Sequence, residues 1–528
     1  MSTDETTGRP TNQPQNLVWS GFQAVTGANT HTFHACPYKG ADHLCLFTGV
    51  QYAGYSRGVG LILDDTLAPV ASVQTQGGLS PMDQHEFTVV GNGESALLTS
   101  YQVRHADLSA NGITGGMGWI MDSWFQEVEL GTNKLLFQWS SLDHVDPSYS
   151  YVPPNSAESS GTGFDPMEPW DYFHINSIDK DSNGDYLVSA RHTATIYKVS
   201  GKDGSIIWQL GGMASDFTIE KPANFKYQHD ARWRFQNSTT TVISIFDNAA
   251  DGYQTQSANF SSGKIIKIDQ TSKTATLLQE FYTPEKFISS SQGSVQVFNN
   301  DWEHGNVFIG WGENAYLSEH TSDGTMVWEA FFATTGSMNY RAYKANFTTN
   351  PTDAPAVYVY AQSMSSPSVW WMSWNGATAV KSWKIYVSPN GATGSFVVLD
   401  AVPNAGFETM YTGDSYHQWS IVEALDGNGN GIRNTSTAVE TFVPGSMLAA
   451  SGGCDEYGCA VAQGYVGRAR VAPQSHIAGS PTVVAVSGPT GSSGGPSRRV
   501  DWKGVMLAEF VGSAAPLALL LSILCFID

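Results

Sequence analysis

Short apolar strands that carry a tryptophan or an apolar equivalent recur through the first two thirds of this 528-residue chain. They follow turn residues at intervals of about 50 to 70 residues, close to the length of one four-stranded propeller blade with loop insertions. The six segments are residues 16–19, 67–70, 134–139, 204–208, 276–279 and 324–328. We therefore predict a six-bladed β-propeller over residues 16–350, preceded by a disordered tail at residues 1–15. Because spacing alone does not separate a closed ring from a stack, stacked repeats are the alternative.

The composition agrees with an all-β protein. The chain has 53 glycines, 23 prolines and 12% aromatic residues, and few of its stretches have a helical period of apolar residues. Its net charge of −21, from 27 basic and 48 acidic residues, opposes binding to nucleic acid. We therefore expect no nucleic-acid partner.

A different strand pattern begins after Pro351. Strand-like runs come about every 8 to 16 residues, which is typical of an immunoglobulin-like or fibronectin-like β-sandwich. The runs are residues 356–360, 369–374, 380–387, 396–402, 407–411 and 418–425. We predict such a sandwich over residues 351–443.

The C-terminal end of the chain has two parts. Residues 444–499 are rich in Gly, Ser and Pro, which predicts a linker. Residues 500–528 form a hydrophobic tail whose uncharged run at 510–527 suits a short transmembrane helix or a lipid-anchor signal. We expect membrane attachment through this tail, and a C-terminal helix docked on the body is the alternative.

Cysteines and glycosylation acceptors favour the secretory pathway. Cys36 and Cys45 form one close pair in the sequence, and Cys454 and Cys459 form another. Each pair predicts a local disulfide, with free thiols as the alternative. Four Asn-x-Ser/Thr triplets predict glycosylation at Asn237, Asn259, Asn346 and Asn434. We expect an extracellular or cell-surface protein, although residues 1–15 contain no apolar core of a signal peptide.

Polar residues cluster in three segments whose apolar alternation otherwise predicts buried strands. These segments are residues 171–178, 185–193 and 225–232. Buried polar groups need partners, so several of them at neighbouring strand positions indicate a lined cavity. No spacing of Cys, His and acidic residues matches a metal site, and we predict none.

The same segments closely resemble the arylsulfotransferase family, in particular its fungal branch. The resemblance rests on HINSIDKDSNGDYLVSARHT at residues 174–193, GSIIWQLGG at 204–212 and QHDAR at 228–232. It extends to DQHEF at 83–87, GWG at 310–312 and WNGAT at 374–378, and covers about residues 16–443.

The resemblance implies a propeller funnel that binds an aryl sulfate and transfers its sulfuryl group to a phenol through a sulfated histidine. No cofactor and no nucleotide sulfate donor is then needed. On the family pattern His229 is the nucleophile, His174, Asn176 and Arg191 hold the sulfuryl oxygens, and His85 completes the pocket. A neutral imidazole is a competent nucleophile, and an arginine with N–H donors suits the charge of a sulfuryl group.

Charge adds two candidates for substrate binding. His192 and Arg232 stand beside the residues above, and cationic groups gathered in an acidic protein would attract an anionic substrate. Side chains alternate between the two faces of a strand, so a residue next to a pocket residue normally points away from the pocket. His192 and Arg232 both occupy such positions.

Two other classes of function remain open. The same histidines and aromatic residues suit a sulfate-independent acid/base enzyme, a cyclase, lyase or isomerase that acts on a phenolic or polyketide compound in fungal secondary metabolism. The third class is a catalytically inactive surface binding protein.

Overall fold

The computed structural model describes residues 17–21, 25, 28–113, 115–154, 160–252, 256–332, 336–444 and 523–524. The chain divides between residues 351 and 352 into two compact units. Both are built from β-strands, and the described ranges contain short 3-10 helices but no α-helix. These 3-10 helices are η2 (Ser109–Asn111), η3 (Pro147–Tyr149), η4 (Lys221–Ala223) and η5 (Phe298–Asn300). The all-β prediction is confirmed.

Five antiparallel sheets of the blade type make up the first unit within its described residues. The first sheet consists of β2 (Asn29–Tyr38), β3 (Ala41–Gln51), β4 (Ser56–Leu63) and β5 (Pro69–Val73). The second consists of β6 (Asp83–Val90), β7 (Ser95–Asp107), β8 (Met117–Glu129) and β9 (Leu135–Ser140). The third consists of β10 (Ile175–Lys180), β11 (Tyr186–Ala190), β12 (Thr195–Val199) and β13 (Ile206–Gly211).

The last two sheets continue this order. The fourth consists of β15 (His229–Gln236), β16 (Thr240–Asp247), β17 (Ser262–Asp269) and β18 (Thr274–Phe281), and β14 (Thr218–Ile219) adds to it as a parallel edge strand on β18. The fifth consists of β19 (Ser294–Val297), β20 (Val307–Gly310), β21 (Tyr316–His320) and β22 (Met326–Phe331). Within each sheet the strands that follow one another in the chain are neighbours, which is the topology of a propeller blade.

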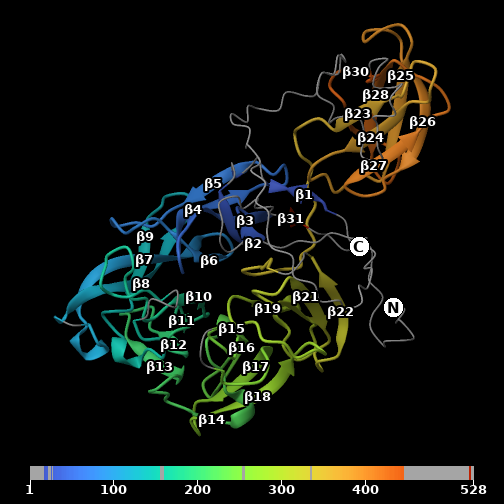
Figure 1. Ribbon diagram of the computed structural model, residues 1–528. Helices are drawn as coiled ribbons and strands as arrows, with labels where there is room; N and C mark the ends of the chain where they lie inside the picture. The colour runs from blue at the N-terminus through green and yellow to red at the C-terminus, as the bar shows by residue number, and fades with distance from the viewer. Residues whose placement is uncertain are drawn as a thin grey trace, which may run out of the picture. The chain divides into compact units, whose positions relative to one another are not determined.

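The sheets are arranged around a common centre, with the first strand of each sheet innermost (Figure 1). The apolar cores lie between adjacent sheets, as the cluster of Phe47, Phe87 and Val128 from the first two sheets illustrates. Five of the six recurring segments predicted as strands overlap β5, β9, β13, β18 or β22, the last strand of each sheet. The sixth, at residues 16–19, ends at β1 (Trp19–Ser20), which pairs with β31 (Ile523–Leu524).

Residues 336–350, here called the closing segment, connect the fifth sheet to the first. Ala342 and Lys344 exchange hydrogen bonds with side chains of β19. Phe347 then packs in a cluster with Leu44 of β3, and the amide of Asn350 donates to the carbonyl of Asp65 at 2.8 Å. The closing segment therefore occupies the gap between the last and first sheets.

Four charged residues, here called the central ion cluster, tie the inner strands together. Glu86, Asp230 and Arg341 are buried, and Arg232 is half-buried. Glu86 of β6 accepts one hydrogen bond from Arg232 of β15 at 2.9 Å and two from Arg341 of the closing segment at 2.9 and 3.2 Å. The same carboxylate accepts from the amide of Ile178 on β10 at 3.0 Å. Asp230 bonds Arg232 at 2.9 Å and accepts from the amide of β19 residue Val295 at 2.9 Å. Four inner strands and the closing segment thus share one network.

The second unit contains two sheets that pack over one core. One sheet has the order β23 (Ala356–Tyr360), β24 (Val369–Ser373), β27 (Glu408–Thr412). The other has the order β26 (Val397–Pro403), β25 (Ser382–Ser388), β28 (Trp419–Leu425), β29 (Gly431–Asn434), and β30 (Val439–Glu440) also pairs with β28. Trp370 and Trp383, one from each sheet, lie in the shared core. The six strands predicted here coincide with β23 to β28 to within about two residues.

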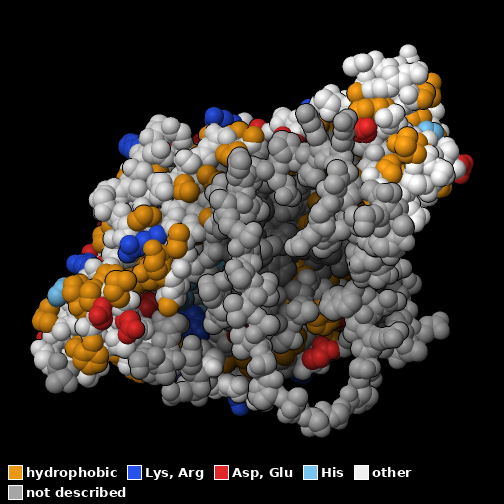
Figure 2. All heavy atoms as spheres, turned by 45° about the horizontal axis from the view of Figure 1, so that its top comes forward, with side chains coloured by type: hydrophobic (Ala, Val, Ile, Leu, Met, Phe, Trp, Pro, Cys, Tyr) orange, Lys and Arg blue, Asp and Glu red, His pale blue; other side chains and the backbone are white. Residues whose placement is uncertain are grey.

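The outer strands of the first unit carry exposed apolar side chains. They are Val70, Leu136, Ile207, Leu278 and Phe331. The coloured part of the face in Figure 2 shows hydrophobic side chains beside acidic and basic ones.

Removing one partner of the central ion cluster should destabilise the first unit strongly. Glu86→Gln leaves Arg232 and Arg341 buried without their shared carboxylate, and loss of one partner of a buried ion pair costs about 3–5 kcal/mol. We expect denaturant unfolding to give a decrease of this size in the free energy of unfolding. The matched change at exposed Glu303 should cost less than about 0.5 kcal/mol. Equal midpoints for the two variants would contradict the role of the cluster.

The same variant should alter acid unfolding. Burial alone would raise the pKa of Glu86, but Arg232 and Arg341 outweigh it and lower the pKa to about 2. A depressed carboxyl pKa stabilises the fold above the pKa of the unfolded chain, and that stability is lost as pH falls toward about 2. Stability curves of wild type and Glu86→Gln should therefore converge between about pH 4.5 and pH 2.

Candidate functional site

A cavity of about 410 Å³ opens where the inner strands begin. His31, His85 and His229 come from β2, β6 and β15, and His174 immediately precedes β10. The other lining residues are Gln51, Gly54, Gln84, Arg191, Asp251, Gly252, Ser290, Ser291, Gln292, Glu313 and Tyr340. All four predicted catalytic residues, His85, His174, Arg191 and His229, line this one cavity.

An irregularity recurs at the start of four inner strands and directs the histidines. The pairing register shifts between His31 and His34, between Asp83 and Phe87, between Ile175 and Ser177, and between His229 and Arg232. A bulge adds a residue to one strand and re-aims its side chains. His174 and Asp230 also have φ of 55°, a left-handed conformation that is uncommon for residues other than glycine. Because of these distortions, the histidine side chains point to the cavity. A regular strand would direct them elsewhere.

Asn248 determines the tautomer of His229. The Asn248 Nδ2 donates to the carbonyls of Ser289 at 2.7 Å and Gln292 at 2.9 Å, so its Oδ1 is the atom 2.7 Å from His229 Nδ1. An amide oxygen can only accept, so Nδ1 carries the proton and the lone pair lies on Nε2. Burial and the charge of Arg191 lower the pKa of His229 well below its ordinary value. His229 is therefore a neutral imidazole with a free electron pair.

The two other histidines predicted to be catalytic, His85 and His174, have carboxylate partners in place of an amide. His85 Nδ1 lies 2.5 Å from Asp83, and His174 Nδ1 lies 2.5 Å from Asp171. The two imidazole rings meet edge to face with their centroids 4.8 Å apart. Burial lowers the pKa of His174 well below its ordinary value, and the charges of His85 and Arg191 add to this effect.

The aspartates of these two pairs differ in their pKa. Burial raises the pKa of Asp171. Burial acts on Asp83 in the same direction, but its bonds from His85 and from the amide of Ser56 hold the pKa of Asp83 below its ordinary value. Asp83 is therefore the more firmly anionic partner.

Arg191 is held at the cavity by backbone carbonyls and a ring. Its Nη2 donates to the carbonyls of Asp251 at 3.2 Å and Ser290 at 3.0 Å, and the guanidinium lies 5.4 Å from the ring centroid of Tyr227. Its charge lowers the pKa of both His174 and His229.

The three predicted substrate-binding residues do not line the cavity. Asn176 is fully buried and donates to the carbonyl of Gln228 at 2.7 Å. His192 stacks on His174 with centroids 4.6 Å apart. Arg232 belongs to the central ion cluster, where Glu86, Asp230 and the carbonyl of Ile178 take its donors. Contact of these three residues with a substrate stays a prediction.

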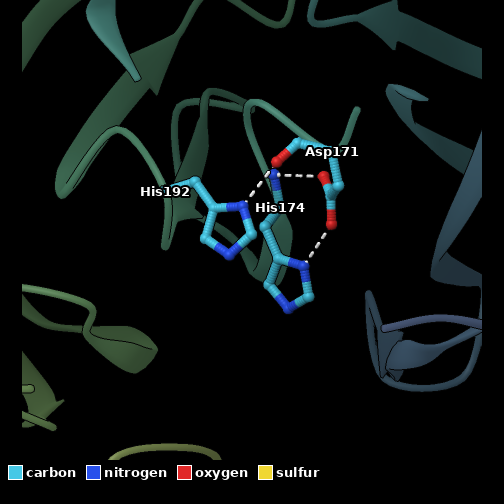
Figure 3. Close-up of side chains that lie close together, drawn as sticks. All are labelled: Asp171, His174 and His192. Carbon is cyan, nitrogen blue, oxygen red and sulfur yellow. Dashed lines mark hydrogen bonds and ion pairs between the residues drawn. The ribbon is translucent and has the colours of Figure 1, made fainter. Parts of the chain in front are cut away.

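Asp171, His174 and His192 form the group in the described ranges whose donor atoms lie close enough to share a metal ion, within 4.8 Å of one another (Figure 3). Imidazole and carboxylate are ligands for zinc and related metals. The Nδ1 of His174 is bonded to the Asp171 carboxylate, and the Nδ1 of His192 lies 2.5 Å from the Asp171 carbonyl. Because these hydrogen bonds account for the proximity of the three residues, we assign no metal here.

Several cavity residues were not predicted from the sequence. His31, Gln292, Glu313 and Tyr340 line the wall, and Asn248 acts from behind His229. A weak signal exists for His31, because Thr30-His31 stands at the position that Gln84-His85 and Gln228-His229 take in other inner strands. The others come from loops with no recurring pattern.

Other predicted sites have different outcomes. The Cys36–Cys45 disulfide is present and joins β2 to β3, whereas Cys454 and Cys459 lie outside the described residues. Asn237, Asn259, Asn346 and Asn434 are exposed, and their glycosylation stays a prediction.

Among the residues that the structure describes, no helix has the length and apolar character required to cross a membrane. The predicted linker and tail fall outside those residues except for residues 444 and 523–524.

Residues 38–333 match the family described as arylsulfotransferase (ASST). The match spans more than half of the chain and contains all four catalytic candidates, so the chain belongs to this family. The match does not distinguish a fungal branch, which stays a prediction. No curated protein sequence matches the chain.

Similar solved structures are distant. A protein of unknown function from Bacteroides caccae is 11% identical, with 60% of this chain and 93% of that chain covered and a TM-score of 0.30. A protein from Lactobacillus plantarum is 10% identical, with 75% and 99% covered and a TM-score of 0.27. The GH43 protein BlXynB from Bacillus licheniformis is 9% identical, with 78% and 90% covered and a TM-score of 0.28. Similarity this low carries no argument about function.

Asn248, the hydrogen-bond partner of His229, can be replaced by aspartate, which has nearly the same shape. Asn248→Asp places a negative charge beside Nδ1, which favours the imidazolium and raises the pKa of His229. We expect carbethoxylation of His229, which needs the neutral ring, to slow by about tenfold or more at pH 6 in the variant. Peptide mass spectrometry measures this rate.

His144, whose ring stacks on Trp139 outside the cavity, serves as an internal control that should react equally in both proteins. An unchanged rate at His229 would mean that Asn248 does not control its protonation.

Proposed function

We propose that this chain transfers a sulfuryl group from an aryl sulfate to a phenol through a sulfohistidine at His229. The observation that carries the proposal is the Nε2 lone pair of His229, which the Asn248 hydrogen bond leaves available in the cavity. Membership of the arylsulfotransferase family supports this class of reaction. The cavity volume of about 410 Å³ suits a small aromatic ligand.

In the first step, His229 Nε2 attacks the sulfur and the bond from sulfur to the aryl oxygen breaks. The aryl group leaves as a phenolate, and His229 carries the sulfuryl group on Nε2 while Nδ1–H stays bonded to Asn248. Arg191 stabilises the charge on the sulfuryl oxygens. In the second step, the acceptor phenol loses its proton, its oxygen attacks the sulfur, and the bond from sulfur to nitrogen breaks. The phenolate released in the first step takes up one proton, and the acceptor phenol loses one, so the protons balance.

His85 is the proposed base for the acceptor phenol. The anionic Asp83 at its Nδ1 stabilises the imidazolium that forms when Nε2 takes a proton. His174 has a different proposed task. Its Nδ1 is bonded to Asp171, and its ring lines the cavity beside His85, so we assign it to contact with the bound sulfuryl group.

We also propose that the first unit is a six-bladed propeller whose sixth blade includes the closing segment and the strand at Trp19. The second unit is proposed to be an immunoglobulin-like domain. The Cys36–Cys45 disulfide and the exposed acceptor asparagines support a secretory location. Membrane attachment through residues 500–528 is proposed on the sequence alone.

A sulfate-independent acid/base reaction is the second candidate function. The observation that favours it is the presence of two Asp–His pairs in one cavity, since such pairs move protons whether or not sulfate is present. A phenolic or polyketide compound would be its substrate.

Intact-mass and peptide mass spectrometry after incubation with 4-nitrophenyl sulfate test the first proposal. We expect one added SO₃ on His229, with release of one nitrophenol per chain, and loss of the adduct when phenol is added. His229→Ala should form no adduct. His144→Ala is the matched control, because His144 stacks on Trp139 outside the cavity, and the adduct on His229 should still form. A folded wild-type protein that forms no adduct would favour the acid/base function.

A further inference from the structure

The hairpin loop between β3 and β4 forms part of the cavity wall and carries two tyrosines. Gln51 and Gly54 of this hairpin line the cavity, and Tyr52 and Tyr55 stand beside them in the sequence. The two tyrosine rings stack with their centroids 5.1 Å apart and an angle of 13° between their planes. We call Tyr52, Tyr55 and the nearby Arg57 the hairpin platform.

The hairpin is fixed against the strand that carries His85. The amide of Ser56 donates to the Asp83 carboxylate at 2.6 Å, and the Ser56 hydroxyl donates to the side-chain oxygen of Gln84. Asp83 is also the partner of His85 Nδ1. The hairpin platform is therefore held in a defined position relative to a histidine of the cavity.

Ring contacts connect the histidines to the hairpin platform. The ring centroid of Tyr101 lies 5.6 Å from that of His85, and the ring centroid of Tyr55 lies 6.1 Å from that of Tyr101. Exposure increases outward, from 1% at Tyr101 through half-buried Tyr55 to 43% at Tyr52. Because several rings separate His85 from Tyr52, a ligand with its hydroxyl at the histidines needs a second ring to reach Tyr52.

Arg57 is the charged member of the hairpin platform. Its guanidinium carbon lies 5.8 Å from the ring centroids of both Tyr52 and Tyr55. Of its guanidinium nitrogens only Nε is buried, and no acceptor within the described ranges bonds any of them. Every other arginine in those ranges donates at least one hydrogen bond. The two terminal nitrogens of Arg57 are thus accessible donors in a fork that matches a carboxylate.

The surroundings of Arg57 favour an anion from a ligand. The nearby Asp83 carboxylate is taken by His85 and by the amide of Ser56, so it does not pair with Arg57. The rest of the chain is strongly acidic, with a net charge of −21, and most of its cations are paired. The stacked rings beside the guanidinium restrict its motion, so less entropy is lost when it binds an anion.

We propose that the hairpin platform binds the far end of a two-ring phenol, with the second ring on Tyr52 and a carboxylate beyond that ring paired with Arg57. The preferred sulfuryl acceptors are then extended aromatic acids rather than single-ring phenols. This inference rests on the proposed function in placing the phenolic hydroxyl at the histidines.

Binding of a matched pair of ligands tests the proposal without any sulfate donor. The compounds 4′-hydroxybiphenyl-4-carboxylate and 4′-hydroxybiphenyl-4-carboxamide have nearly the same shape, and only the first is an anion. Isothermal titration of the full chain should give a dissociation constant for the carboxylate about fivefold or more below that for the amide. Equal constants would overturn the proposal.

A charge variant locates the effect at Arg57. Arg57→Met removes the charge from a side chain that has no hydrogen bond to lose, and the affinity ratio of the biphenyl carboxylate to its amide should fall toward one. Lys202→Met is the matched control, because it removes an exposed cation from the turn between β12 and β13, and the ratio should stay as in wild type. A ratio unchanged in Arg57→Met, or lowered equally in Lys202→Met, would overturn the assignment.

A ring variant tests the contact with Tyr52. In Tyr52→Leu both biphenyl ligands should bind about threefold or more weakly, because the second ring loses its aromatic partner. Binding of 4-hydroxybenzamide, which has a single ring, should stay as in wild type. Unchanged affinity for the biphenyl ligands, or an equal loss for 4-hydroxybenzamide, would reject the contact of the second ring with Tyr52.

The outcome is separable from that of the sulfotransferase proposal. Sulfation of His229 with equal binding of the biphenyl carboxylate and its amide would reject the hairpin platform alone. Preferential binding of the carboxylate without sulfation of His229 would reject the sulfotransferase chemistry and keep the hairpin platform as a binding site for an aromatic acid.

Discussion

The buried charges of the central ion cluster are the interaction on which the rest of the first unit depends. Inner strands that start at one centre bring backbone carbonyls there, where no sheet neighbour can satisfy them. Arg341 donates to the carbonyls of His85 at 2.8 Å and Asn176 at 2.6 Å, in addition to its bond with Glu86. A buried polar network of this kind is stable only when every member is satisfied. The hydrogen bonds of the cluster can all form in only one arrangement of the inner strands. The cluster therefore determines how these strands are positioned.

The site and the cluster use neighbouring residues of the same strands. His85 lines the cavity and Glu86 joins the cluster, and on β15 the same relation holds for His229 and Asp230. The position of each histidine is thus tied to a residue that cannot move without breaking an ion pair. Such coupling gives the rigid placement that a reacting group requires. It also explains why a strained left-handed conformation at Asp230 persists, because the surrounding bonds determine it.

Much of the fold could be predicted from the sequence because its signals are local. Turn residues followed by a short apolar run located the outer strands β9, β13, β18 and β22, and regular spacing located β23 to β28. The site could be predicted only in part, because its geometry depends on long-range contacts. Arg232 was predicted to bind substrate, yet the register shift after His229 places it in the ion cluster. Asn248 and Arg341 have no local pattern at all, since their partners are distant in the sequence.

Three of the four histidines that line the cavity, His85, His174 and His229, differ mainly in the group that is bonded to Nδ1. An amide beside His229 adds no charge, so a neutral ring with an exposed lone pair is the favoured form, which suits a nucleophile. The carboxylate beside His85 belongs to Asp83, whose pKa is lowered. The carboxyl beside His174 belongs to Asp171, whose pKa is raised. One kind of side chain can thus take three tasks in one cavity, because burial makes each ring sensitive to its partner. Conserving the imidazoles while exchanging their partners should therefore redistribute the tasks rather than abolish binding.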